Sequence, residues 1–117
     1  MNTSNNKISN KPSKDLIDKL IYEKGLRITQ VLVVKKQDSL IVFLSNANTI
    51  TVKLSYFPRL KKATQVQLDQ WKLISKGIGI EWAEIDEDLS LKGLIHQLIL
   101  LNTLKFVAGE NTLAMAA

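Results

Sequence analysis

Three consecutive stretches rich in β-forming residues, separated by short polar turns, constrain the fold of this chain more than any other feature of its sequence. They span residues 28–34, 40–44 and 50–56, and the third alternates strictly between apolar and polar side chains. Such alternation is typical of strands with one buried face. The turns are too short for anything but antiparallel neighbours, so the sequence predicts an antiparallel meander with residues 40–44 in its centre. Asparagines in the second turn suit left-handed backbone. Pro58, which lacks an amide hydrogen, is expected to end the third strand.

A capping box predicts a helix after the meander. Thr64 and Gln67 have the spacing at which the threonine hydroxyl accepts from the glutamine amide while the glutamine side chain reaches back. The helix is expected to end at about Gly77, where glycine favours termination. Its apolar face would consist of Leu68, Trp71 and Ile74.

Two further helices and a fourth short strand complete the expected α+β fold, an antiparallel β-meander packed against two or three helices. Residues 14–24 form a short amphipathic pattern, and residues 78–82 alternate like a strand. A C-terminal helix is expected to start near Leu89, because the acidic residues before it suit the positive end of a helix dipole. Its apolar face would consist of Leu91, Leu94, Ile95 and Leu98.

The length of 117 residues suits one domain. We expect a flexible leader over residues 1–13, a single α+β domain over 14–108 and a weakly structured tail over 109–117. The polar leader has no apolar core of a signal peptide, and the chain has no run of about 20 apolar residues that could span a bilayer. We therefore expect a cytoplasmic protein.

Composition limits the chemistry of the chain. It has no cysteine and one histidine, His96, which excludes disulfides, thiolate nucleophiles and metal centres built from cysteine or several histidines. Ser90 has no partner base in the sequence around it, so we predict no catalytic residue and no cofactor. The net charge is +5, and fourteen of the sixteen basic residues lie in residues 1–76. This basic half leaves nucleic-acid binding open.

The segment from Leu40 to Leu94 resembles a small bacterial family known as domain of unknown function 2442. The resemblance rests on Tyr56-Phe57-Pro58-Arg59-Leu60, Ala63-Thr64, Trp71-Lys72-Leu73-Ile74, Gly77, Gly79-Ile80-Glu81-Trp82, Asp86-Glu87-Asp88-Leu89-Ser90 and Gly93-Leu94. It implies a compact α+β domain and no catalytic residues, because the family has no established activity. Members that stand beside a second small gene in toxin–antitoxin-like pairs, or are fused to a helix-turn-helix domain, imply an accessory or regulatory binding role. This chain differs in its Asn46-Ala47-Asn48 turn, its additional N-terminal helix and its longer C-terminal helix.

Two charged segments are the candidate interaction residues. In the acidic one, Glu84-x-Asp86-x-Asp88 has the alternate spacing of a calcium loop, but Leu89 replaces the required glycine and Ile95 the bidentate glutamate. A magnesium site and a purely structural helix start remain alternatives, and we predict no metal. The acidic candidates are Asp86, Glu87 and Asp88, and the basic ones are Arg59, Lys61 and Lys62. The basic run either grips a phosphate or an acidic partner, or pairs through Arg59 with the acidic segment.

Two tryptophans are the remaining candidates. Trp71 and Trp82 are expected on apolar faces, where core packing is favoured over a role as interface anchors.

These observations lead to a functional hypothesis. We expect a non-enzymatic protein-binding or regulatory module of a small complex, either antitoxin-like or an accessory partner. The alternative is a nucleic-acid-associated regulator with a basic surface over residues 53–76.

The composition of the C-terminal helix indicates which partner the chain binds. It is apolar on nearly every side, with Ile99, Leu100, Leu101, Leu104, Phe106 and Val107 beyond its first face. A helix of this kind must be buried nearly all round. A homodimer through this helix is therefore expected, unless the N-terminal helix covers it within one chain.

Overall fold

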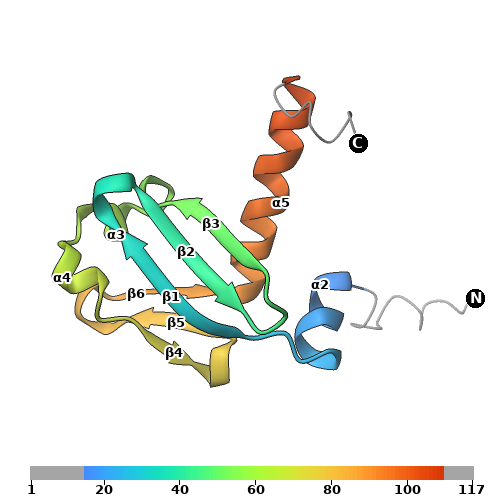
Figure 1. Cartoon of the computed structure of the whole chain (residues 1–117), viewed down its shortest axis with the longest axis horizontal. Helices are drawn as coiled ribbons and strands as arrows, with labels where there is room; N and C mark the ends of the chain where they lie inside the picture. The colour runs from blue at the N-terminus through green and yellow to red at the C-terminus, as the bar shows by residue number, and fades with distance from the viewer. Residues whose placement is uncertain (1–14, 110–117) are drawn as a thin grey trace, which may run out of the picture.

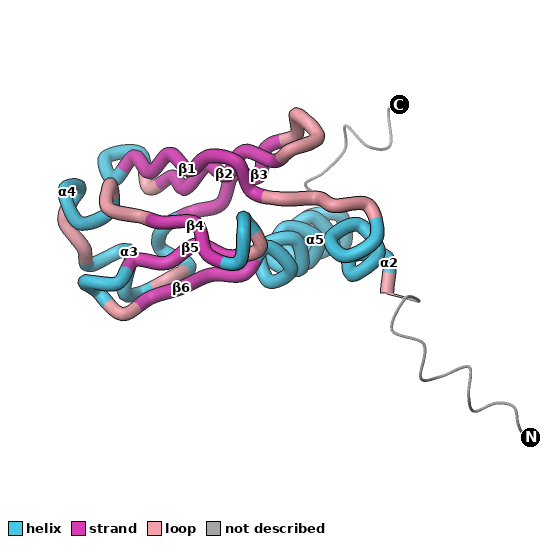
Figure 2. Tube along the Cα trace, turned by 90° about the horizontal axis from the view of Figure 1, so that it is seen from below, coloured by secondary structure: helices cyan, strands magenta, loops and turns pink. Residues whose placement is uncertain are grey.

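The computed structural model describes residues 15–109, which form two antiparallel sheets of three strands each and a long C-terminal helix. The first sheet consists of β1 (Ile28–Val34), β2 (Ser39–Leu44) and β3 (Thr49–Lys53), and the second of β4 (Lys72–Ile74), β5 (Gly79–Trp82) and β6 (Glu87–Ser90). Figure 2 shows the sheets as two layers. The expected α+β class is confirmed, although the second sheet has two strands that the sequence did not predict.

The predicted meander is confirmed, with β2 in its centre. Leu40 of β2 lies opposite Val33 of β1 and Val52 of β3, and all three side chains are buried. The third strand is shorter than predicted, because the chain leaves the sheet at Leu54 and continues as a 3-10 turn over Leu54–Tyr56. Pro58 does not end the strand. It is instead the first residue of α3 (Pro58–Lys62), where its missing amide hydrogen costs nothing.

The turn between β2 and β3 uses an unexpected residue. Ala47, rather than either neighbouring asparagine, has the left-handed backbone, with φ of 72°. The side chain of Asn46 accepts a hydrogen bond from the Asn48 amide at 3.1 Å, which stabilises the turn from one side. An alanine in this conformation is strained, because its Cβ approaches the backbone.

The predicted capping box is present, but the helix behind it is a single turn. Thr64 Oγ1 accepts from the Gln67 amide at 3.1 Å, and the Thr64 amide donates to Gln67 Oε1 at 3.0 Å. The helix α4 (Gln65–Leu68) then ends, so the prediction of a helix to Gly77 is wrong. Residues 72–74 form β4, because left-handed backbone at Ser75 and Lys76 reverses the chain and pairs them with β5.

The acidic segment lies on a strand rather than at a helix start. Residues 87–90 form β6 and pair with β5, and α5 (Leu91–Val107) begins only after them. The helix predicted to start near Leu89 is present and begins at Leu91, but the prediction that the acidic residues lie at its positive end is wrong, because they belong to β6 and the turn before it. Ser90 caps this helix, since its hydroxyl accepts from the Gly93 amide at 2.9 Å.

The N-terminal helix is confirmed as α2 (Leu16–Asp18) and a π-helical turn over Lys19–Glu23. It is tied to the start of α5 by Lys92, whose Nζ lies 2.9 Å from Asp18 Oδ1 and 3.3 Å from Asp15 Oδ2. The hydrogen bond to Asp18 is the main cause of a raised pKa of Lys92. The contact covers the first turns of α5 only, and Figure 1 shows the rest of α5 rising away from the sheets.

One core joins both sheets, α2 and the first half of α5. Its buried side chains include Ile21, Leu40, Val42, Leu54, Leu60, Leu68, Ile80, Trp82, Leu91 and Leu94. The expected leader and all but the first residue of the expected tail lie outside the described residues. Among the described helices, none has both the length and the apolar character needed to cross a bilayer.

Candidate functional site

Arg59 and the acidic segment are in contact, as the sequence predicted. Arg59 Nη1 donates to the main-chain carbonyl of Asp86 and lies 3.3 Å from Asp86 Oδ2. The contact fastens α3 to the turn before β6. Because 59% of the Arg59 side chain and 97% of the Asp86 side chain are exposed, the ion pair is expected to contribute only about 0.2–1 kcal/mol.

The other charged candidates do not join this pair. Lys61 Nζ lies 3.5 Å from Asp38 Oδ1, on the opposite side of α3 from the acidic segment, and Lys62 is exposed. On β6, Glu87 is half-buried and Asp88 is exposed. The basic and acidic segments therefore meet at one contact only, and most of their charge faces solvent.

The two tryptophans are part of the hydrophobic core. Trp82 is 1% exposed, and its Nε1 donates to the main-chain carbonyl of Leu68 at 2.9 Å. This bond satisfies its polar atom inside the core. Trp71 is half-buried and packs against the same core. Both tryptophans therefore belong to the packing of the second sheet.

The acidic spacing that resembles a calcium loop does not converge on a cation site. Glu84 accepts a hydrogen bond from Gln67 Nε2 at 3.2 Å, and Asp86 points to the solvent beside Arg59. Within residues 15–109, no group of three or more histidine or carboxylate side chains is arranged to hold a metal ion.

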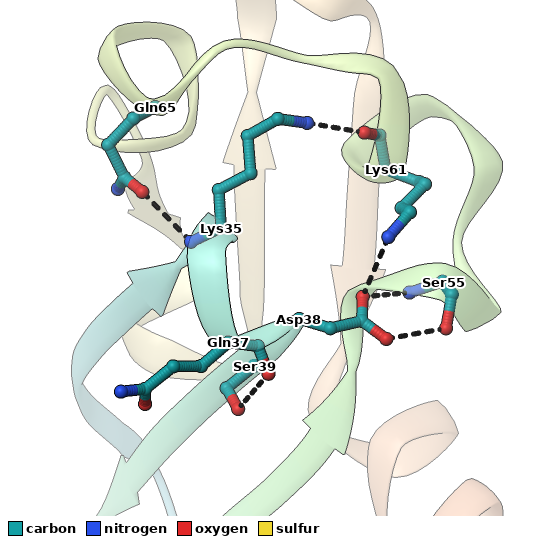
Figure 3. Close-up of polar contacts among 7 residues, drawn as sticks. All are labelled: Lys35, Gln37, Asp38, Ser39, Ser55, Lys61 and Gln65. Carbon is teal, nitrogen blue, oxygen red and sulfur yellow. Dashed lines mark hydrogen bonds and ion pairs between the residues drawn. The ribbon is translucent and has the colours of Figure 1, made fainter.

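A polar network that the sequence did not predict joins the β1–β2 turn to α3 (Figure 3). The Asp38 carboxylate accepts from the Ser55 hydroxyl at 2.8 Å and from the Ser55 amide at 2.9 Å. The Ser55 hydroxyl is the main cause of a lowered pKa of Asp38. Lys35 Nζ in turn donates to the carbonyl of Lys61 at 2.6 Å. Asp38 has left-handed backbone, with φ of 51°, and an aspartate in a polar turn was the available signal.

Gln65 extends this network along the outer edge of β1. Its Oε1 accepts from the Lys35 amide at 2.9 Å, and its Nε2 donates to the Val33 carbonyl at 2.8 Å. Val33 belongs to the edge strand and Lys35 is the first residue after it, so the side-chain amide occupies the place that a further strand would take at this end of β1. The network therefore fixes α3 and α4 and closes the C-terminal end of the β1 edge.

The network also gathers lysines at one end of the first sheet. Lys35 and Lys36 in the β1–β2 turn lie beside Lys61 and Lys62 of α3, because Lys35 is bonded to the α3 backbone. Asp38 neutralises part of this charge through Lys61. We call these four residues the lysine cluster. It extends the basic surface predicted over residues 53–76 by two lysines from an earlier part of the chain.

A hollow of about 320 Å³ lies where α5 diverges from β3. Leu101 and Lys105 line it from the helix, and residues 51–53 line it from the sheet edge. Lys105 thus faces the body of the protein rather than the open side of α5. A second hollow of about 330 Å³ lies between Phe57 and the start of α5.

The open side of α5 beyond this hollow carries a continuous apolar surface. Its large side chains are exposed at Ile99 (51%), Leu100 (54%), Leu104 (55%), Phe106 (52%) and Val107 (76%). At 3.6 residues per turn, Ile99, Leu100, Thr103 and Val107 lie opposite to Leu94 and Leu98, which pack on the body, and Leu104 and Phe106 flank them on either side. We call Ile99, Leu100, Thr103, Leu104, Phe106 and Val107 the distal face.

Comparisons with known proteins agree with the resemblance drawn from the sequence. The model of the family described as "Protein of unknown function (DUF2442)" matches residues 28–99. A crystal structure of a protein of unknown function from Rhodospirillum rubrum is similar at 27% identity and a TM-score of 0.56, covering 62% of this chain and 88% of that one. A solution structure of an uncharacterized protein from Chromobacterium violaceum is similar in fold, at 21% identity and a TM-score of 0.57, covering 82% and 85% of the two chains. No curated protein sequence matches the chain.

The family match covers more than half of the chain, which therefore belongs to the family of unknown function DUF2442.

Proposed function

We propose that the chain is a protein-binding, regulatory module of a small cytoplasmic complex, and that it binds its partner through the distal face of α5. The observation that carries this proposal is the exposure of five large apolar side chains on one side of a helix that stands clear of the body. Apolar side chains grouped in this way mark an interaction surface, because their contact with water is unfavourable until a partner covers them.

The two halves of α5 differ in their contacts with the core, which supports a binding role for the second half. Leu91 and Leu94 are buried, and Ile95 and Leu98 pack against the core, so the first half of α5 anchors the helix. The second half adds little to the core, yet it continues as a regular helix to Val107. A binding role accounts for that extension, and it fits the accessory or antitoxin-like role that the family resemblance implies.

The experiment is affinity purification from the native cell with the tagged chain and two variants. The double variant Leu100→Glu/Leu104→Glu places charges on the distal face, and Leu32→Glu is the matched control. Leu32 is 46% exposed on the solvent side of β1, which is close to the 54% and 55% of the two helix positions. We expect the partner to be retained by Leu32→Glu and lost from the double variant. Retention by the double variant would contradict the proposal.

The lysine cluster favours a second candidate, a nucleic-acid-associated regulator. It brings together two lysine pairs from separate parts of the chain, since Lys35 Nζ donates to the Lys61 carbonyl and Lys36 and Lys62 are their neighbours in sequence. Phosphate contacts release counterions, so binding through this cluster would weaken steeply with salt. Titrating nucleic-acid binding against salt, with the double substitution Lys36→Glu/Lys62→Glu, separates the candidates. Salt-dependent binding that this variant abolishes, and that the α5 variant leaves intact, would favour the second candidate.

A further inference from the structure

We infer that the occupant of the distal face is a second copy of this chain, paired through α5 about a two-fold axis near Thr103 with the two helices antiparallel. The inference rests on the proposed function, since it names the protein that the distal face binds. Four observations support the inference. They are the polar content of the distal face, its central residue, its area, and the charge of the body of each chain, by which we mean the two sheets and the helices packed on them.

The distal face is free of ionisable side chains. Lys105 is the only charged residue between positions 99 and 107, and it lines the hollow on the opposite side of the helix. Thr103 is the one polar residue of the face, and its hydroxyl donates to the Ile99 carbonyl at 2.8 Å. Because that bond is internal to the helix, burying Thr103 leaves no unsatisfied donor. The face can therefore be covered entirely by apolar surface.

Thr103 also sets the geometry of a pair. It is the smallest side chain of the face and lies in the middle, with larger apolar side chains on both sides along the helix. A small central residue lets two helices approach closely, and flanking large residues then pack against those of the partner. An isologous pair of this kind repeats each contact twice, since the same patch serves both copies.

The area suffices for a reversible dimer. Five side chains that are 51% to 76% exposed present roughly 500 Å² of apolar surface per chain. A two-fold pair that covers all five side chains would bury about 1,000 Å² in total, which is near the lower limit of specific interfaces. A dissociation constant in the micromolar range is therefore expected.

Charge selects the antiparallel arrangement. Each chain has a net charge of +5, and a parallel pair of helices would place the two bodies side by side. An antiparallel pair sends the bodies in opposite directions, because each helix carries its body at its N-terminal end (Figure 1). Repulsion between the bodies is smaller at that distance and is further reduced by salt.

Sedimentation equilibrium of the purified chain tests the pairing. Between about 1 and about 100 µM, the mean mass should rise from 13.2 kDa toward twice that value. Leu100→Glu/Leu104→Glu should remain at the monomer mass, and Leu32→Glu should behave like the wild type. A wild-type monomer at the highest concentration, or a double variant that still dimerises, would overturn the inference. The wild type could instead remain a monomer while affinity purification shows that the double variant loses a different protein. That result would overturn the inference of a second copy and would leave the proposed function intact.

Disulfide trapping tests the orientation, since the chain has no cysteine of its own. Under oxidation, Thr103→Cys should form a cross-linked dimer, because its two copies face each other at the axis. Val107→Cys should not, because four residues at 1.5 Å per residue separate its two copies by about 12 Å along an antiparallel pair, beyond the reach of a disulfide. Cross-linking at both positions would show a parallel pair, and cross-linking at neither would show that the axis lies elsewhere. Either result would overturn the arrangement.

Discussion

Replacing Gly77 by alanine is expected to destabilise the fold far more than the same change at Gly25, although both glycines have left-handed backbone. The φ angles are +97° at Gly77 and +76° at Gly25. A Cβ at Gly77 would lie 2.6 Å from the carbonyl oxygen of Ile28, whereas a Cβ at Gly25 would meet nothing within 4 Å. The two substitutions therefore share the cost of an unfavourable backbone conformation and differ in a steric clash.

The magnitudes follow from these distances. Left-handed backbone costs an alanine about 1 kcal/mol relative to glycine, which is the whole effect expected for Gly25→Ala. At Gly77 the obstructing atom belongs to the backbone of β1, so relief requires the β4–β5 turn to move away from the first sheet. Overpacking of this kind adds about 1–3 kcal/mol. We expect Gly77→Ala to lower the free energy of unfolding by about 2–4 kcal/mol, a large share of the stability of a small domain.

Urea unfolding followed by tryptophan fluorescence measures both variants, because Trp82 of β5 is buried in the core. The dependence of the free energy on urea should keep the wild-type slope, which shows that the same surface is exposed on unfolding. Equal losses at Gly77 and Gly25 would refute the steric argument. They would show that the turn relaxes without disturbing β1.

Three further outcomes are expected. Ala47→Gly should raise the free energy of unfolding by up to about 1 kcal/mol, because glycine removes the strain of left-handed backbone in the β2–β3 turn, and a urea melt measures the gain. A double-mutant cycle between Arg59→Ala and Asp86→Asn should give a coupling of a few tenths of a kcal/mol that disappears at high salt, since both side chains are exposed. The pKa of Asp38 is lowered, chiefly by the Ser55 hydroxyl, so its contribution to stability is complete above the ordinary value of 3.8 and is lost as the pH falls through the lower folded value. Asp38→Asn should therefore reduce the loss of stability in acid, as measured by urea melts on both sides of that pH.

The first sheet was predictable because its information is local. Residues 28–34 and 40–44 carry enough β-branched and apolar side chains to define strands, and the turns between them are short. The end of β3 was not predictable, since it depends on Asp38. The Asp38 carbonyl accepts from the Leu54 amide at 3.1 Å and its carboxylate binds Ser55, which turns the chain out of the sheet. Polar contacts across that distance in sequence leave no periodic pattern.

The second sheet shows why the predicted helix to Gly77 failed. The capping box is real, but an N-terminal signal does not fix where a helix ends. Leu68, Trp71 and Ile74 recur at an interval that suits a helix, but Ile74 belongs to β4, where it pairs with Gly79 of β5. The partner strand decided the outcome, and only tertiary structure contains it.

The candidate site was predicted in part. The contact of Arg59 with Asp86 followed from opposite charges in two segments, and the exposed apolar half of α5 followed from its composition. The role of Gln65 could not be predicted, because a glutamine whose amide bonds to the edge of β1 looks in the sequence like any exposed glutamine.

The sheet edges give an independent reason to place protein contacts on the helix. An exposed edge strand invites a further strand, and proteins prevent this with short edges, charges or cover. Here the Gln65 amide covers the C-terminal end of β1, α5 passes beside β3, β4 has only three residues, and β6 carries Asp88 exposed to solvent. Each described edge strand thus has at least one feature that disfavours the addition of a further strand. The distal face has no charge or cover of this kind, and its large apolar side chains are 51% to 76% exposed. An unprotected apolar surface on an otherwise protected molecule is the pattern expected where binding is selected rather than avoided.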